Sequence, residues 1–315
     1  MRIENIGEFG LIERLTKLIP IKDQDVIVGF GDDCSCVKVD KKLLLFTNDI
    51  QVENVHFIKH LQDPKDIGWK LISVNVSDVL ACGGIPRWAQ VSLGLPKNLE
   101  YQFIEDVYLG IRQALDYYQF YVIGGNVSSS KQIVLDLFLV GETQRFLSRK
   151  DAQEGDWVYM YGYTGLSKAG LELLLMGKSS YEDFEKRLIE SFTRPVIDLE
   201  FRQFLHKNAK ACIDISDGLV ADLGHIANQS RKKIVIFKDR LPIHRDLTAY
   251  CKKYKKDPYQ YILYGGEDYI PAFSSSKDLN RNKVFKIGKV EEGQGVYLKT
   301  GTKLQNLKPQ GFEHF

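Results

Sequence analysis

Acidic residues beside glycines or small residues mark the points of this 315-residue chain where chemistry could take place. The first is Gly31-Asp32-Asp33, in which two adjacent carboxylates follow the apolar run at 26–28. Adjacent aspartates repel each other and are rarely buried unless something pairs with them. No lysine or arginine stands next to them in the sequence. The pair is therefore either a solvated turn or one wall of a cation site.

The same pattern recurs along the chain, mostly at the ends of apolar segments. The residues concerned are Asp32, Asp33, Asp49, Asp78, Asp214, Asp217, Glu267 and Asp268. If they converge in the fold, their mutual repulsion calls for bound cations. Oxygen ligands without several Cys or His select a hard ion, and Mg²⁺ usually shares its carboxylates with substrate phosphates. An acid-lined cleft of this kind suits phosphoryl transfer.

Two glycine-containing segments bear on phosphate binding. Gly124-Gly125-Asn126 follows a predicted strand at 120–123 and could bring backbone N–H groups close to a phosphate, although a hairpin would use the same residues. Gly177-Lys178-Ser179 resembles the end of a P-loop, but the first glycine of that motif would fall at Glu172, so a P-loop is excluded. No protein-kinase signature is present.

Apolar periodicity predicts the elements that must position these side chains. In the first half it predicts helices over 7–18, 67–80 and 101–117 and strands over 37–39, 43–46, 88–95, 120–123 and 133–140. In the second half it predicts strands over 157–161, 211–215, 233–237, 269–273 and 285–290, a short strand at Val296, and helices over 166–175, within 181–207 and over 217–228. This alternation predicts a mixed α/β fold with α+β character. Chain length and a polar stretch at 149–155 favour two domains, 1–147 and 148–315.

Composition narrows the class of protein. The 43 basic and 41 acidic residues nearly cancel, which gives no reason to expect nucleic acid or a membrane surface as a partner. No apolar run approaches the ~18–20 residues that span a bilayer, and the N-terminus does not resemble a signal peptide. The five cysteines are expected to be reduced thiols, which favours the cytoplasm. Cys34 and Cys36 lack further ligands for zinc and are expected to pack behind the Asp pair.

Longer motifs carry a resemblance to a known family. They are Gly7-Glu8-Phe9-Gly10-Leu11-Ile12, Gly31-Asp32-Asp33-Cys34, Val52-Glu53-Asn54-Val55-His56-Phe57, Asn75-Val76-Ser77-Asp78, Ser92-Leu93-Gly94-Leu95-Pro96, Ile213-Asp214-Ile215-Ser216-Asp217-Gly218-Leu219, Gly265-Gly266-Glu267-Asp268-Tyr269 and Gly311-Phe312-Glu313-His314-Phe315. With them the chain resembles, nearly end to end, the thiamine-monophosphate kinases of the aminoimidazole-ribonucleotide synthetase-like superfamily.

The resemblance implies ATP-dependent phosphorylation of thiamine monophosphate to thiamine diphosphate, by direct in-line transfer assisted by several Mg²⁺ ions. It also implies a two-domain aminoimidazole-ribonucleotide synthetase-like fold and a homodimer formed through the N-terminal domain. The implied magnesium ligands are Asp33, Thr47, Asn48, Asp49, Asp78, Asn126, Asp214 and Asp217. The implied nucleotide contacts are Tyr108, Gly125, Asn126, Arg149 and Ser216, and the implied substrate contacts are His56, Glu267 and Phe312.

The residue types agree with these roles, since an arginine can fork onto phosphate oxygens and a cationic thiazolium suits a carboxylate and an aromatic face. Without the resemblance, His56, Tyr108 and Phe312 are better interpreted as packing residues. Asn48 and Asn126 depart from the family pattern, which usually has Thr and Asp there. Because Asn126 brings no charge, one metal is expected to bind more weakly. Two alternatives stay open: a sibling ATP-dependent synthetase, whose reactive N-terminal Cys is absent, and a degenerate nucleotide-binding homologue.

Overall fold

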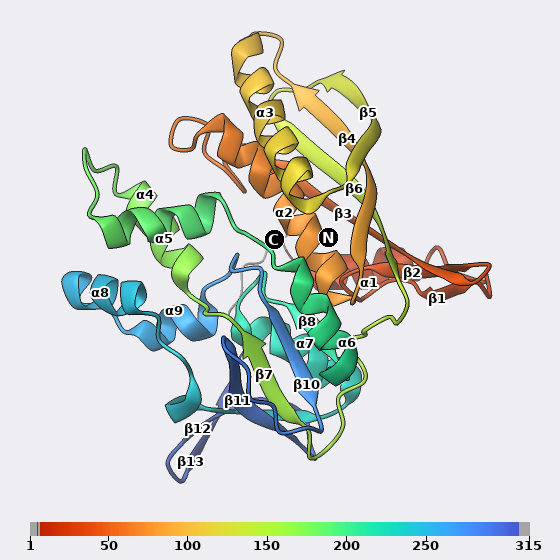
Figure 1. The fold of residues 1–315 in the computed structure, drawn as a ribbon, viewed down its shortest axis with the longest axis vertical. Helices are drawn as coiled ribbons and strands as arrows, with labels where there is room; N and C mark the ends of the chain where they lie inside the picture. Colours follow the sequence, from red (N-terminus) through yellow and green to blue (C-terminus); the bar gives the residue numbers. More distant parts are fainter. Residues whose placement is uncertain (1–4, 6, 309–315) are drawn as a thin grey trace.

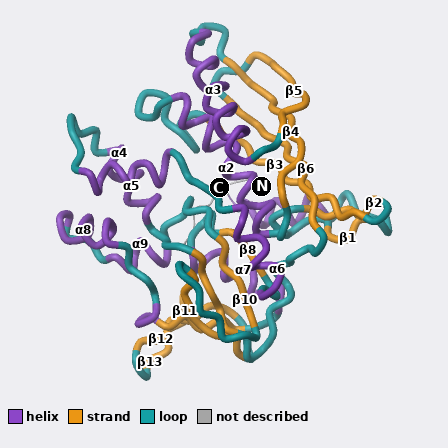
Figure 2. The backbone as a smooth tube through the Cα atoms, in the orientation of Figure 1, coloured by secondary structure: helices purple, strands orange, loops and turns teal. Residues whose placement is uncertain are grey.

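The chain forms two β-sheets in succession, and helices lie around and between them (Figure 1). The structure is a computed structural model that describes Asn5 and residues 7–308. Figure 2 shows how the strands gather into two separate groups, with the longest helices beside the first group. Both sheets are mixed, and helices occur in both halves of the chain, so the predicted α/β class with α+β character is confirmed.

The first sheet has six strands in the order β1-β2-β3-β6-β4-β5. Their bounds are β1 Val26–Val28, β2 Ser35–Val39, β3 Lys42–Val52, β4 Ile85–Leu95, β5 Tyr121–Ser129 and β6 Val134–Thr143. The β4–β5 pair is parallel and the other neighbours are antiparallel. Helix α1 (Glu8–Thr16) precedes the sheet, and α2 (Pro64–Ala81) and α3 (Tyr101–Tyr118) pack together on the inner side. Side chains on β3, β4 and β6 alternate between this covered face and an exposed outer face.

The second sheet has seven strands in the order β13-β12-β9-β11-β7-β10-β8. The strands are β7 Trp157–Tyr161, β8 Cys212–Asp214, β9 Lys233–Phe237, β10 Pro271–Ser275, β11 Val284–Glu291, β12 Gly295–Thr300 and β13 Lys303–Leu307. The α-helices of this half are α4 Leu166–Leu175, α5 Asp183–Thr193, α6 Arg202–Asn208, α7 Leu219–Ser230, α8 Arg245–Tyr254 and α9 Pro258–Tyr264, with 3₁₀ turns at Leu199–Phe201 and Lys238–Arg240. Figure 1 shows α4, α5, α8 and α9 grouped together to one side of this sheet.

Helix α2 joins the two halves. It is buried nearly all round, which a helix achieves only when apolar partners cover every side of it. Asp63 caps its N-terminus by accepting the Lys65 N–H, and Pro64 occupies the first turn, where no N–H is needed. On the side of the second half, Trp69 Nε1 and Ser73 Oγ both donate to the Pro195 carbonyl, at 2.7 and 2.9 Å. Side chains on α2 can therefore reach residues of both halves.

Three strands differ most from the sequence-based expectation, and one of them is β3, which runs to Val52 where the apolar run predicted an end at Phe46. β5 does not end at Gly124 but continues to Ser129, because residues 124–129 pair in parallel with β4. A Cβ at position 125 would lie 2.0 Å from the Val91 carbonyl oxygen, so glycine permits this close pairing rather than a turn. β13 lies in a segment where polar residues alternate with few apolar ones, and its sequence shows no strand pattern.

Among the described residues, no helix is long and apolar enough to cross a membrane.

Candidate active site

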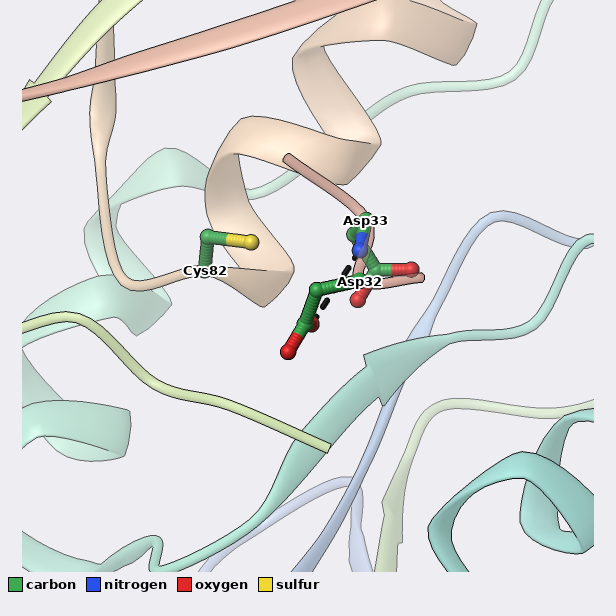
Figure 3. Close-up of side chains that lie close together, drawn as sticks. All are labelled: Asp32, Asp33 and Cys82. Carbon is green, nitrogen blue, oxygen red and sulfur yellow. Dashed lines mark hydrogen bonds between the residues drawn. The ribbon is translucent and has the colours of Figure 1, made fainter. Parts of the chain in front are cut away.

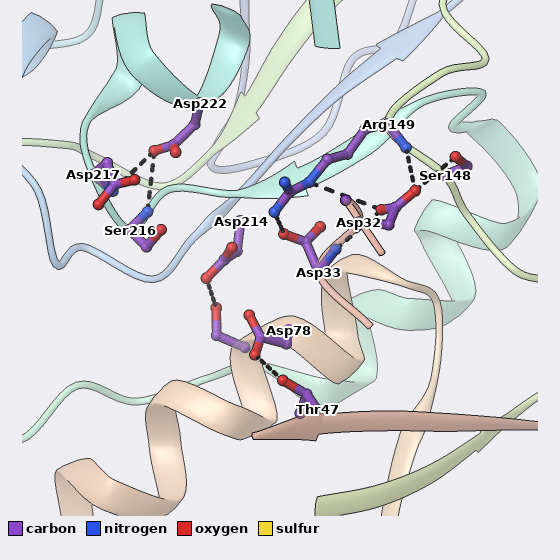
Figure 4. Close-up of polar contacts among 12 residues, drawn as sticks. Asp32, Asp33, Thr47, Asp78, Ser148, Arg149, Asp214, Ser216, Asp217 and Asp222 are labelled. Atoms are coloured by element: carbon purple, nitrogen blue, oxygen red, sulfur yellow. Dashed lines mark hydrogen bonds and ion pairs between the residues drawn. The ribbon is translucent and has the colours of Figure 1, made fainter. Parts of the chain in front are cut away.

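Three aspartates from distant parts of the chain meet between the two sheets. Carboxylate oxygens of Asp33, Asp78 and Asp214 all lie within 4.8 Å of one another. Asp33 follows β1, Asp78 lies in the last turns of α2, and Asp214 ends β8 (Figure 4). Two hydroxyls orient them: Thr47 Oγ1 donates to Asp78 Oδ2 at 2.6 Å, and Ser77 Oγ donates to Asp214 Oδ2 at 2.8 Å.

Asp49 adds a fourth carboxylate on the same side. On β3, Thr47, Asp49 and Gln51 alternate with exposed Asn48 and Ile50, so the first three face α2. Burial raises the pKa of Asp49 to about 6, and the charges of Asp136 and Asp33 add to the rise, while a hydrogen bond with Asp78 partly offsets it. The packing of β3 against α2 thus brings Asp49 and Asp78 together from a sequence separation of 29 positions.

Asp32 and Asp33 do have a basic partner, although the sequence places it far away. The guanidinium of Arg149 pairs through Nη2 with Asp33 Oδ1 and lies 3.8 Å from Asp32 Oδ1. Asp32 Oδ2 accepts from Ser148 Oγ at 2.7 Å and from the Arg149 backbone N–H at 3.2 Å. Asp32 therefore ties its turn to the 148–149 segment, while Asp33 faces the acid cluster. One oxygen of Asp33, Oδ2, is buried without a hydrogen-bond partner among the described residues.

A thiol lies behind the Asp pair. Cys82 Sγ comes within 4.8 Å of carboxylate oxygens of both Asp32 and Asp33 (Figure 3). Burial raises the pKa of Cys82 well above its usual value, so it stays a neutral thiol. Cys34 and Cys36 are buried in the core, and all five cysteines are free.

Two further acids, Asp222 and the predicted site residue Asp268, accept hydrogen bonds from backbone N–H groups at the start of a helix. Asp222 Oδ2 accepts from the backbone N–H groups of residues 216, 217 and 218, at 3.1, 3.2 and 3.0 Å. Asp268 accepts from the backbone N–H groups of Gly165 and Ser167, at 2.5 and 3.1 Å, where α4 begins. Each satisfies N–H groups that a helix start leaves without an intrahelical partner. Asp268 therefore stands apart from the Asp33–Asp78–Asp214 cluster.

Burial dominates the electrostatics of the cluster. It raises the pKa of Asp33 to about 7, that of Asp214 to about 6 and that of Asp78 well above the ordinary value. For Asp78 and Asp214 the neighbouring carboxylates add to the rise, while Arg149 partly offsets it for Asp33. In such a site the carboxylates are more stable when they are protonated or bound to metal ions than when they are ionised without a countercharge.

These shifts predict a pH dependence of the metal-free protein. Acids whose pKa is raised on folding stabilise the fold below their unfolded value and lose that contribution as the pH rises through the folded value. Because the pKa values of Asp33, Asp49 and Asp214 rise from an ordinary value of 3.8 to about 6 to 7 on folding, the melting temperature in EDTA should fall between about pH 4 and pH 7. Mg²⁺ should reduce this fall, since bound ligands stabilise the folded state. The prediction would be contradicted if the melting temperature fell equally with pH in EDTA and in Mg²⁺.

A cavity of about 700 Å³ opens beside the cluster. Its lining includes Asp49, Asp78, Asp214, Ser216 and Asp217, together with His56, Gln62, Phe192, Tyr264, Glu267 and Tyr269. Four of the implied metal ligands, all of them aspartates, and two of the implied substrate contacts thus share one cavity. Among them, His56 Nδ1 accepts the Val52 backbone N–H at 3.0 Å, so the neutral ring carries its proton on Nε2.

Several implied residues lie elsewhere. Asn48 points to the outer face of the first sheet, whereas its neighbours Thr47 and Asp49 point to the inner face. Asn126 is also on the outer face, in a row that runs Ile50–Asp136–Ser92–Asn126 across four strands, or about 14 Å from β3. Gly125 lies next to it on the same edge strand, and Tyr108 is 42% exposed on α3. Phe312 lies outside the described residues.

The cavity also contains residues that sequence reasoning did not single out. Gln62 is 7% exposed; its Oε1 accepts the Ile58 N–H at 3.0 Å, and its Nε2 has no hydrogen-bond partner among the described residues. Behind Glu267 lies Lys70, with Nζ 2.8 Å from Glu267 Oε1. The sequence contained one indication of this buried charge, a lysine inside the apolar stretch 67–72. Helix α2 exposes no side on which that charge could be solvated, so the lysine needs a partner.

Comparison with known proteins agrees with this fold and site. Residues 31–143 match the family described as AIR synthase related protein, N-terminal domain. The hydrogenase maturation protein HypE of E. coli shares the fold, with a TM-score of 0.69 over 97% of this chain and 99% of that chain at 16% identity. Residues 31–143 thus form an AIR synthase-related domain, and the whole chain has the fold seen in HypE.

Closer relatives identify the family. The chain is 46% identical to the thiamine-monophosphate kinase of Aquifex aeolicus (strain VF5), over 100% of both sequences. A solved structure described as AaThiL complexed with AMPPCP and TMP matches with a TM-score of 0.93 and 44% identity, over 100% of this chain and 99% of that chain. The chain belongs to the thiamine-monophosphate kinase family.

Proposed function

We propose that this chain transfers the γ-phosphoryl group of ATP to the phosphate of thiamine monophosphate, giving thiamine diphosphate. The observation that carries the proposal is the convergence of Asp33, Asp78 and Asp214 within 4.8 Å beside a cavity of about 700 Å³, in a member of this family. Such a volume is that of a small-molecule site. Transfer between two phosphates brings much negative charge together, which an acidic site tolerates only with cations.

The acid cluster fits Mg²⁺. Its donors are carboxylate and hydroxyl oxygens, and the buried Asp33 Oδ2 has no partner among the described residues. Asp33, Asp49, Asp78 and Asp214 would hold the ions, with Thr47 beside them and Asp217 at the cavity wall. When bound, such ions offset the charge on phosphate oxygens.

The remaining residues of the site have roles that their positions support. Arg149 lies against Asp33 and would offer guanidinium N–H groups to phosphate oxygens. Ser216 lines the cavity at the turn after β8. His56, Glu267 and the aromatic Tyr269 also line the cavity, and a carboxylate with an aromatic face suits a cationic heteroaromatic ring.

The proposal is tested by incubating the purified protein with ATP, Mg²⁺ and thiamine monophosphate and separating the products by chromatography. Formation of thiamine diphosphate with equal amounts of ADP supports it. ATP hydrolysis without thiamine diphosphate would overturn it in favour of a different acceptor. Binding of ATP without any turnover would favour a degenerate homologue.

The Asn126 departure leads to a separate prediction about magnesium demand. We expect Asn126→Asp to reach half-maximal activity at a lower Mg²⁺ concentration than the wild type, because it restores a carboxylate where the family pattern has one. The measurement is initial rate against Mg²⁺ at fixed ATP. Identical curves for the two proteins would sink the idea.

A homodimer accounts for the position of Asn126. The outer face of the first sheet carries Ile50, Trp88, Tyr121 and Phe138, which are 47, 38, 72 and 37% exposed. An exposed apolar sheet face of this kind is typical of an interaction surface. Pairing of two such faces would bring Asn48 and Asn126 of one protomer toward the other, and light scattering on the intact protein tests it.

The organisation that we propose keeps the two units predicted from the sequence, 1–147 for nucleotide, metal and dimer contacts and 148–315 for further metal and substrate contacts. The first sheet ends at Thr143 and the second begins at Trp157, which brackets this boundary. We also propose a cytoplasmic location, which five free, buried thiols support.

A further inference from the structure

A buried ammonium group lies directly behind the substrate side of the cavity. Lys70, on α2, has a side chain that is 2% exposed. Its Nζ lies 2.8 Å from Glu267 Oε1 and 3.8 Å from the centroid of the Phe192 ring. Among the described residues, Glu267 is its one hydrogen-bonding partner. Buried lysines are rare unless they are paired, so this one has a specific relation to Glu267.

The ion pair crosses from one half of the chain to the other. Lys70 belongs to the helix that covers the first sheet, and Glu267 lies in the loop between α9 and β10. The Glu267 side chain is 30% exposed and lines the cavity, whereas Lys70 is not among the lining residues. The ammonium therefore acts on the cavity through the carboxylate that it holds.

The backbone around Glu267 is fixed independently of Lys70. Glu267 and Tyr269 both adopt left-handed φ angles, 62° and 50°, which are unfavourable for side chains with a Cβ. Hydrogen bonds hold them there: Glu267 N–H donates to Ser216 O at 2.7 Å, and Tyr269 N–H donates to Ile215 O at 2.8 Å. A Cβ at Gly266 would lie 2.5 Å from the same Ser216 oxygen, so the loop packs closely on the turn after β8.

With the backbone fixed, the remaining freedom of Glu267 is the rotation of its side chain. Lys70 Nζ and, at 3.4 Å, the Tyr269 hydroxyl both contact the same oxygen, Oε1. Because the carboxylate group is planar, holding Oε1 in place restricts the positions that the second oxygen, Oε2, can adopt. Without Lys70 the carboxylate would be a mobile, uncompensated charge, and a recognising group that moves binds less well.

We propose that Lys70 is a positioning residue for substrate recognition: it anchors Glu267 Oε1 so that the second oxygen accepts a hydrogen bond from the cationic heteroaromatic part of the phosphate ester. This inference rests on the proposed function. It assigns Lys70 to the organic end of the substrate, apart from the acids that would hold metal ions.

The test compares steady-state kinetics of the wild type, Lys70→Met and Lys70→Arg. Lys70→Met, which keeps the length but not the charge, should raise the KM for thiamine monophosphate about tenfold while kcat and the KM for ATP change less than about threefold. Lys70→Arg restores the ion pair and should recover most of the affinity. A purely structural role would instead lower the amount of active protein and leave both KM values unchanged, which would overturn the proposal.

A double variant separates action through Glu267 from any other effect. Glu267→Gln alone should also raise the KM for thiamine monophosphate, and adding Lys70→Met to it should raise the KM no further. The double variant buries no charged side chain at this point, so it also serves where Lys70→Met alone folds poorly. If the KM of the double variant rose by the product of the two single effects, Lys70 would act independently of Glu267, and the proposal would be overturned.

The outcome can be told apart from a failure of the proposed function. Calorimetric binding of thiamine monophosphate to the wild type and to Lys70→Met needs no turnover. If the wild type binds but makes no product, the phosphotransfer proposal fails while the roughly tenfold difference in binding still supports the role of Lys70. Equal binding by the two proteins would overturn that role alone.

Discussion

Asp49→Asn should reduce the rate of thiamine diphosphate formation by at least about a thousandfold, because a carboxylate that holds a metal ion at reacting phosphates contributes several kcal/mol. Asparagine has nearly the same shape as aspartate but no charge. The pKa of Asp49 is raised to about 6 mainly by burial, so the metal-free protein loses no favourable ionic contact in the variant. Its melting temperature in EDTA at pH 8 should equal or exceed that of the wild type.

A matched control is available on the same hairpin. Asp40 is exposed in the turn between β2 and β3, at a left-handed φ of 54°, a conformation that asparagine also adopts readily. Asp40→Asn should therefore keep full turnover and the wild-type melting temperature. Turnover by Asp49→Asn within about tenfold of the wild type would mean that Asp49 is not a required metal ligand.

The sequence predicted the elements that carry the acids more reliably than the partners of those acids. Apolar runs placed Asp49 just beyond a strand at 43–46 and Asp214 in a strand at 211–215, and helical spacing placed Asp78 near the end of a helix. The structure has Asp214 at the end of β8 and Asp78 in the last turns of α2, but β3 continues past Asp49 to Val52. These are local patterns, and each depends on residues within one turn or one strand. The convergence of the three carboxylates was a hypothesis from their number and positions, and the fold brings them within 4.8 Å for Asp33, Asp78 and Asp214.

Local sequence patterns could not predict interaction partners that lie in distant segments of the chain. Asp32 and Asp33 appeared to lack a basic neighbour, yet Arg149 lies against both from a sequence separation of more than a hundred positions. Asp268 resembled the site acids in its glycine context but caps α4. Lys70 could not be paired with Glu267 either, because only the packing of α2 against the second half brings them together. Face alternation also separates Asn48 from Asp49, which adjacency in the sequence conceals.

Arg149→Met should lower the free energy of unfolding by about 3–5 kcal/mol in the absence of metal, which is the usual effect of removing one partner of a buried ion pair. The Arg149 side chain is 17% exposed, and the Asp33 side chain that it pairs with is 1% exposed. The variant leaves two adjacent buried carboxylates, whose pKa values are already raised by burial and by a neighbouring carboxylate, Asp33 for Asp32 and Asp214 for Asp33. Urea unfolding in EDTA at pH 8 measures the loss.

Two further variants test whether the loss of stability comes from the buried Arg149–Asp33 ion pair. Arg112→Met removes an arginine that is 77% exposed and 3.8 Å from Asp116, so its effect should stay below about 1 kcal/mol. Arg149→Met/Asp33→Asn removes both partners and should recover most of the stability that Arg149→Met loses, since no unpaired charge remains on Asp33. If Arg112→Met and Arg149→Met were equally stable, the Arg149–Asp33 pair would not be a buried ion pair in solution.

Magnesium connects this stability argument to the function. A divalent cation and the Arg149 guanidinium are alternative countercharges for the same carboxylate, because Asp33 presents Oδ1 to Arg149 while its buried Oδ2 has no hydrogen-bond partner among the described residues. The destabilisation of Arg149→Met should therefore shrink when urea unfolding is repeated with excess Mg²⁺. An undiminished loss in Mg²⁺ would mean that no metal ion reaches Asp33, and the metal assignment of Asp33 would fail even if turnover depends on Asp49.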